Sequence, residues 1–219
     1  MGELKSLRYL RSPRSMAFIG ALVAIVTLTS AASETDEVVG SVVKLKGSAI
    51  AMQDAMPRIL KLQAPILMGD VVSTGKNSRV AIKMIDEAQF NLGARTNFVV
   101  EEYFLREQGS NAAVRLLSGA VGIVTGKIAS LDRRPFLLNT ATATIGVRGT
   151  TFWGGEIDGS LQFALLKGKG ITIENKAGAV EINNIGHGTA VPSENSAPTP
   201  PKMWGQGKLD RAPAMTNPD

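Results

Sequence analysis

Residues 67–93 read LMGDVVSTGKNSRVAIKMIDEAQFNLG, and they contain two short apolar–polar alternations separated by turn residues. Val80, Ile82 and Met84 alternate with Arg79, Ala81 and Lys83, and a second alternation follows at residues 89–93. Successive side chains of a β-strand point to opposite faces of the sheet, so a period of two places the apolar set on a core face. This stretch therefore predicts two short strands, each with one buried face.

The same pattern recurs from residue 38 to residue 191. Val43 and Leu45 alternate with lysines, and a longer alternation covers residues 161–165 before a Lys-Gly-Lys-Gly turn. Strands at intervals of about 8 to 12 residues are typical of all-β domains, and no segment in this range has a sustained helical period. We expect one all-β domain over residues 38–191, built as a two-sheet β-sandwich or as a short β-solenoid. Periodicity alone does not separate these two architectures.

Residues 1–32 have the features of an export signal. Four basic residues precede the apolar run that begins at Met16, and Ser30 and Ala32 are small residues at the positions a signal peptidase reads. We predict a signal helix that is cleaved after Ala32. A retained anchor is the alternative, because the 17 residues from Met16 to Ala32 reach the short end of the roughly 17–25 that span a bilayer. Either outcome predicts an exported domain, periplasmic or secreted.

Residues 192–219 carry six prolines among Ser, Asn and Thr. This composition is typical of disordered segments, since it offers little apolar surface for a core. We expect a flexible Pro-rich tail whose removal after Val191 leaves the domain folded.

Composition excludes several classes of function. The chain has no cysteine, and its single histidine, His187, lies between turn glycines without a Gly-x-Ser-x-Gly nucleophile elbow to serve. Without the charges of residues 1–15, the formal net charge falls from +5 to +2, because four basic residues and one acid are lost. The remaining basic residues are dispersed among acids. We therefore expect no enzyme activity, no cofactor, no metal site and no nucleic-acid partner.

The order Leu-x-Gly-Asp-x-x-x-Thr-Gly-x-x-Ser-x-Val-x-Ile in residues 67–82 resembles a motif of the FecR domain family. Residues 116–121 and 136–152 resemble the family's later Leu-x-x-Gly-x-Val and Gly-x-Arg-Gly-Thr-x-Phe segments, in the same order. Two places depart from the family pattern. Ala141 replaces the usual proline, and residues 86–88 read Asp-Glu-Ala where Asp-Gly-Ser is usual, so we expect a looser turn or a turn of another type there.

The resemblance singles out two turn motifs as candidate site residues: Gly69, Asp70, Thr74 and Gly75 in the first, and Arg148, Gly149 and Thr150 in the second. An aspartate at a bend can accept backbone N–H bonds, and Gly75 would permit a positive φ before the next strand. Arg148 can pair with an acid or with backbone carbonyls. We interpret both motifs as structural rather than catalytic or cofactor-binding.

The resemblance implies an exported, non-enzymatic binding or scaffold module of the bacterial cell envelope. Some family members relay the state of an outer-membrane iron–siderophore transporter, so signal relay is one of the roles that the resemblance implies. Only about 15 residues precede the apolar segment, and we do not expect direct control of a sigma factor to carry over.

A carbohydrate-binding or carbohydrate-active β-solenoid is the alternative function, supported only by the exported, β-rich and Gly-rich character. Few aromatic side chains are available to stack on sugar rings, and the only tryptophans are Trp153 and Trp204. The expected partner is an envelope protein or a polysaccharide. A membrane would be a partner only if residues 1–32 are not cleaved.

Overall fold

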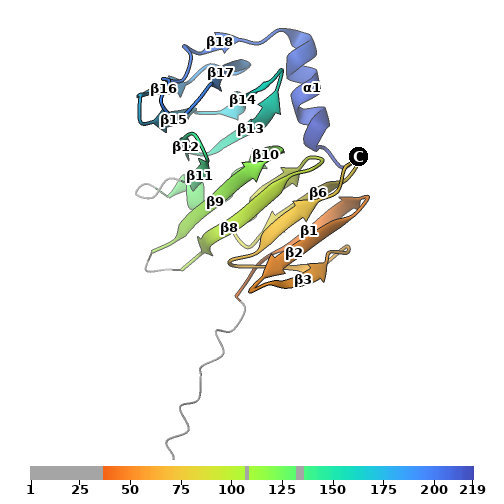
Figure 1. Ribbon diagram of the computed structural model, residues 1–219. Coiled ribbons are helices and arrows are strands. Elements are labelled where there is room, and N and C mark those ends of the chain that lie inside the picture. The colour runs from red at the N-terminus through yellow and green to blue at the C-terminus, as the bar shows by residue number, and fades with distance from the viewer. Residues whose placement is uncertain (1–36, 107–108, 132–135) are drawn as a thin grey trace, which may run out of the picture. The chain divides into compact units, whose positions relative to one another are not determined.

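The computed structural model describes residues 37–106, 109–131 and 136–219 (Figure 1). Two nine-stranded β-sheets in this part of the chain pack on a common core. The all-β prediction is confirmed, and of the two expected architectures the structure is the sandwich. The predicted signal segment, residues 1–32, lies outside the described residues.

The strands of the first sheet, in spatial order, are β18 (Lys202–Met203), β17 (His187–Val191), β14 (Ser160–Gly168), β13 (Thr150–Ile157), β10 (Ala120–Val124), β7 (Gln89–Leu92), β6 (Arg79–Met84), β1 (Val38–Lys46) and β4 (Pro65–Leu67). Those of the second sheet are β16 (Gly178–Ile182), β15 (Ile171–Asn175), β12 (Thr144–Val147), β11 (Phe136–Thr140), β9 (Asn111–Ser118), β8 (Asn97–Phe104), β5 (Val71–Thr74), β2 (Ala49–Gln53) and β3 (Met56–Ile59). A short 3₁₀ helix, Ile128–Ser130, follows β10, and the helix α1 (Gln206–Thr216) ends the chain.

The chain advances through both sheets in one direction, as the colour gradient of Figure 1 shows. In each sheet the strand numbers rise almost without reversal from the N-terminal edge to the C-terminal edge. The strand pairs are antiparallel except β9 and β11, which are parallel. This sandwich therefore adds its strands in sequence order along each sheet, as a solenoid does. For this reason the strand spacing in the sequence was compatible with both architectures.

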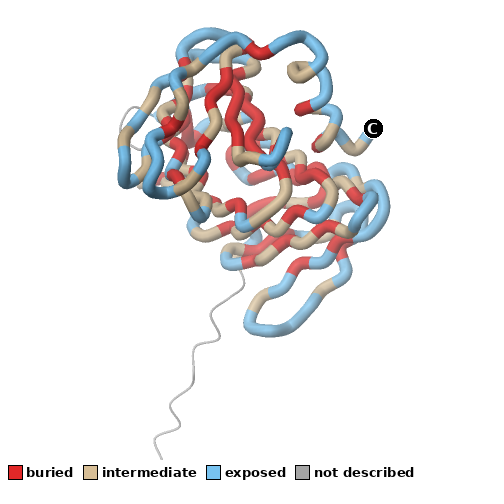
Figure 2. Tube along the Cα trace, turned by 45° about the horizontal axis from the view of Figure 1, so that its top comes forward, coloured by how far each residue is buried: buried red, intermediate tan, exposed pale blue. Residues whose placement is uncertain are grey.

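The main core lies between the two sheets, where buried residues from every part of the domain meet (Figure 2). The apolar set of the predicted strands faces it: Val80, Ile82 and Phe90 are fully buried, whereas Lys83 between them is exposed. Phe90 packs against Phe98 and Phe136 at ring-centroid distances of 5.5 and 5.8 Å. Aromatic contacts of this kind join β7 of one sheet to β8 and β11 of the other.

The strand β1 differs from the alternation read in the sequence. Val42 faces the core at 0% exposure, whereas Val43 is 38% exposed. The pairing of β1 with β6 shifts between Val42 and Lys44, so an extra residue is inserted there. A bulge of this kind turns the following side chains to the other face, which a period-of-two reading cannot anticipate.

The C-terminal segment is ordered, and the prediction of a flexible tail over residues 192–219 is wrong. Trp204 and Ala212 are 5% and 0% exposed, and they pack with Trp153 and Ala164 in a second, smaller core. The rings of Trp153 and Trp204 meet edge to face at a centroid distance of 6.2 Å. The composition-based prediction failed because a polar, Pro-rich segment can be ordered by a few apolar residues that pack on an apolar sheet face.

This segment crosses the outer face of the first sheet from β17 to β1. Glycines in the sheet make room for it: a Cβ at Gly188 would lie 2.4 Å from the Trp204 ring, and one at Gly122 would lie 3.0 Å from the Thr216 hydroxyl. Farther along, the Arg79 Nε donates a hydrogen bond to the Met215 carbonyl at 3.0 Å. The first sheet is thus covered on both faces along this path. No helix within residues 37–106, 109–131 and 136–219 is long and apolar enough to cross a membrane.

Candidate functional site

The first motif forms the turn between β4 and β5, and its central group is the carboxylate of Asp70. Both carboxylate oxygens accept a hydrogen bond from the Arg58 guanidinium at 2.6 Å, and one also accepts the Leu67 N–H at 2.8 Å. The side chain of Asp70 is completely buried, and that of Arg58 is 32% exposed. A buried charge is tolerated when it is paired and hydrogen-bonded. Asp70 therefore links the turn to the edge strand β3.

Thr74 and Gly75 continue this motif on the other side of β5. The Thr74 hydroxyl donates to the Gly93 carbonyl at 2.6 Å and accepts the Thr96 N–H at 2.9 Å. Gly69 has a φ of +88°, but Gly75 is not among the residues with positive φ, so the expectation for Gly75 is wrong. A Cβ at Gly75 would lie 2.8 Å from the Ser48 hydroxyl oxygen, and this close approach is the reason for glycine.

The second motif joins β12 to β13. The Thr150 hydroxyl donates to the carbonyls of Arg148 and Gly170 at 2.9 and 3.1 Å, and the Thr150 N–H donates to the Thr125 hydroxyl at 2.8 Å. Gly149 has a φ of +57° and is exposed. The Arg148 side chain is exposed and forms no ion pair or side-chain hydrogen bond with a described residue. Neither of the two expected kinds of partner, an acid or a backbone carbonyl, is therefore found in this part of the chain.

No hydrogen bond connects the two motifs among the described residues. Each is a local network that ties a turn to its neighbouring strands. Their structural role remains a prediction, which the variants in the Discussion test.

A second buried carboxylate, at the turn that departs from the family pattern, was not predicted from the sequence. Asp86 is 1% exposed, and it accepts hydrogen bonds from the Tyr103 hydroxyl at 2.6 Å and from the N–H groups of Ala88 and Ile128. Burial, and then the hydrogen bond to Asp86, raise the pKa of Tyr103 well above its ordinary value. The only available signal was its place in the family's Asp-Gly-Ser turn.

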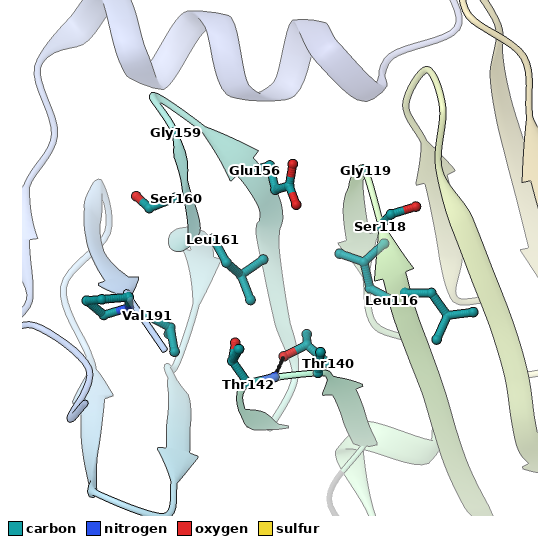
Figure 3. Close-up of a pocket in the computed structure, with 13 residues that line it drawn as sticks. Leu116, Ser118, Gly119, Thr140, Thr142, Glu156, Gly159, Ser160, Leu161 and Val191 are labelled. Atoms are coloured by element: carbon teal, nitrogen blue, oxygen red, sulfur yellow. Dashed lines mark hydrogen bonds between the residues drawn. The ribbon is translucent and has the colours of Figure 1, made fainter. Parts of the chain in front are cut away.

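A groove opens at one end of the strands, where four chain segments meet (Figure 3). Its volume is about 370 Å³. Figure 3 shows Leu116 and Leu161 on facing walls, with Thr140 and Thr142 on one side and Glu156 on another. The remaining lining residues come from the turns between β9 and β10, β11 and β12, and β13 and β14, and from the end of β17: Leu117, Ser118, Gly119, Ala141, Gly159, Ser160, Val191 and Pro192.

The chemistry of this groove suits binding. Among the described residues that line it, Glu156 is the only one with an ionisable side chain, and none is a histidine or a lysine that could exchange protons with a substrate. His187 lies at the start of β17 rather than in a loop, and it does not line the groove. Across the described residues, no group of three His, Cys, Asp or Glu could hold a metal ion.

Comparison with known proteins agrees with the resemblance found in the turn motifs. Residues 70–169 match the family model described as FecR protein. The match begins at Asp70 and includes both motifs apart from Gly69. None of the curated proteins matches the sequence.

The fold resembles two crystal structures of a "putative anti-sigma factor" from Parabacteroides distasonis ATCC 8503, determined at 1.65 and 2.50 Å. Each aligns with a TM-score of 0.52 and 14% sequence identity, over 64% of this chain and 62% of that chain. The alignment thus spans less than two thirds of the structures it matches, and at this identity it shows a shared fold.

Proposed function

We propose that this protein is an exported signal-relay module that acts through protein contacts in the bacterial cell envelope. The observation that carries the proposal is the FecR domain match over residues 70–169 in a sandwich whose groove is equipped to bind. Signal relay through binding needs a stable scaffold and an accessible contact surface. The two sheets supply the first, and the groove at the strand ends supplies the second.

The carbohydrate alternative has no comparable support. No aromatic side chain lines the groove. Trp153 and Trp204 are 0% and 5% exposed beneath the C-terminal segment, where they cannot stack on a sugar. A protein partner is therefore the better proposal.

The test of regulation is an in-frame deletion of the gene in its native host, followed by transcript profiling. We expect a limited set of transcripts to change, and expression of the wild-type protein from a second locus to restore them. Complementation with a Gly149→Val variant, designed to impair the fold, serves as the matched control and should restore them incompletely. Transcript levels that are unchanged by the deletion, in growth conditions in which the protein is made, would contradict the relay role.

The test of export is the intact mass and the location of the protein made in its native host. The Ser30-Ala31-Ala32 sequence predicts a mature chain that begins near Ser33 and is recovered in a soluble exported fraction. A Ser30→Arg, Ala32→Arg variant should be retained with its N-terminal segment, because signal peptidases require small residues there. Full-length wild-type protein in the membrane fraction would support the anchor instead.

A further inference from the structure

The groove of Figure 3 has apolar walls and an acidic rim. Leu116 and Val191 are 3% and 2% exposed, and with Leu161 they form an aliphatic surface that leads inward. The only charged side chain in the lining is the carboxylate of Glu156, which is exposed and forms no ion pair or hydrogen bond with a described side chain. Arginine and lysine are absent from the lining, although the chain as a whole is basic.

An unused hydroxyl group lies in the same groove. The Thr142 Oγ1 is buried and has no hydrogen-bond partner in the part of the chain that the structure describes. The neighbouring Thr140 Oγ1, by contrast, donates to the Ala143 carbonyl and accepts hydrogen bonds from two N–H groups. A buried polar atom without a partner is costly, so native proteins rarely keep one unless water or a ligand supplies the bond. Ser118 and Ser160 accept bonds from amide groups of Asn97 and Gln162, and their hydroxyl protons remain available.

We infer that this groove binds the side chain of a lysine or arginine presented by a partner polypeptide. The aliphatic stem of such a side chain packs on leucine and valine while its charged head remains near solvent, which matches the order of apolar wall and acidic rim. The cationic head donates to the Glu156 carboxylate and, for the longer guanidinium, to the Thr142 hydroxyl. This inference rests on the proposed function, since it names the chemistry of the contact that a relay module would make.

Two cations face Glu156 from the opposite side. Arg79 and Arg95 line an adjoining hollow together with Glu156, Met215 and the turn at Ser118. The Arg79 Nε already donates to the Met215 carbonyl, and neither arginine lies within ion-pair distance of Glu156. Their positive charge weakens the attraction for a third cation by Coulomb repulsion. Removal of the Arg95 charge should therefore strengthen binding.

The test is an NMR titration of the ¹⁵N-labelled exported protein, including its C-terminal segment, with two small probes. Nα-acetyl-arginine N-methylamide carries the proposed side chain, and Nα-acetyl-citrulline N-methylamide has nearly the same shape without the charge. We expect saturable shifts of the Gly119, Thr142 and Gly159 amide signals with the arginine probe, weakened by salt. An equal affinity for the citrulline probe, or no saturable shift at these amides, would overturn the inference.

Three variants locate the interaction. Glu156→Gln should lower the affinity for the arginine probe about fivefold, the size expected of an exposed ion pair of about 1 kcal/mol. Arg95→Gln should raise it, and Glu174→Gln, which removes an exposed carboxylate outside the groove, should leave it unchanged. Equal loss in the Glu156 and Glu174 variants would show a non-specific charge effect and contradict the site.

The proposed groove and the proposed relay function can be refuted independently of each other. If the protein binds the arginine probe but its deletion leaves transcription unchanged, the groove proposal stands and the relay role is refuted. A transcriptional effect that is fully restored by Glu156→Gln, together with an absence of probe binding, would retain the relay role and refute the groove.

Discussion

Single residues in this protein are constrained in three distinguishable ways. Gly149 has a positive φ with open space around it, whereas Gly75 has an ordinary φ and two serine side chains within 3 Å of the position a Cβ would take. Asp70 is constrained by charge, because its buried carboxylate balances Arg58. The two family motifs therefore combine a conformational, a steric and an electrostatic requirement.

The first prediction concerns Gly149. Gly149→Val should lower the free energy of unfolding by about 1–3 kcal/mol, since a β-branched residue is disfavoured at a φ of +57°. Gly149→Asn is the matched control, and it should cost less because asparagine tolerates the left-handed region. Denaturant unfolding measures both. A valine variant as stable as the wild type would show that the turn adopts another conformation.

The second prediction concerns Tyr103, the only tyrosine in a chain that begins at Ser33. Its folded-state pKa is raised by burial and by the hydrogen bond to Asp86, so its contribution to stability is full below the unfolded pKa of about 10 and is lost as pH rises above it. Phenolate absorbance should therefore appear only together with alkaline unfolding, as followed by circular dichroism. Phenolate formation near pH 10 in a folded protein would contradict this buried pair.

At the scale of elements, the turn between β6 and β7 shows how a departure from the family pattern is accommodated. Glu87 occupies the place where the family has glycine, and it has a φ of +71°. Its carboxylate accepts a hydrogen bond from Lys127 at 2.6 Å, and this interaction lowers the pKa of Glu87. Glycine adopts a positive φ without steric cost, whereas glutamate adopts it only with some strain. The turn therefore has a backbone conformation that suits glycine better than the Glu87 it contains.

The third prediction follows from this turn. Glu87→Gly should be more stable than Glu87→Ala by about 1 kcal/mol, because both variants lose the Lys127 contact and only glycine relieves the positive φ. Thermal unfolding of the two variants measures the difference, about 2–4 °C for a domain of this size. Equal melting temperatures would mean that the turn carries no conformational strain at this position.

At the scale of the whole molecule, the C-terminal segment completes the fold. Both tryptophans lie in the small core that it covers, and Lys208 lies 4.4 Å from the Trp204 ring centroid while donating to Gln162 at 2.6 Å. The helix α1 contains Pro213 and Gly207 and has no side-chain cap at its start. Such a helix is weak in isolation, so the sheet beneath it supplies most of its stability.

The fourth prediction is that truncation after Val191 destabilises the domain. Exposure of Trp153 and loss of Trp204 should lower the melting temperature by about 10 °C, the effect expected of removing a buried tryptophan. Tryptophan emission should shift to the red, since Trp153 would then face water. Removal of residues 217–219 alone is the control and should have little effect. If truncation after Val191 left the melting temperature unchanged, the contacts between the C-terminal segment and the sheet would not contribute to stability.

The sequence by itself determined the local features of this protein. Alternation predicted the strands around Val80 and Phe90. The turn motifs located Asp70 and Gly149, and their order gave the resemblance to the FecR domain family. These signals are local because side-chain period and backbone dihedral preferences act over a few residues. The groove and the ordered C-terminal segment were decided only by the tertiary structure. Thr142 lies in the turn between β11 and β12 and Glu156 lies in β13, and Trp204 contacts Trp153 across 51 positions of chain. Contacts at such separations depend on strand order and register, which no local pattern records.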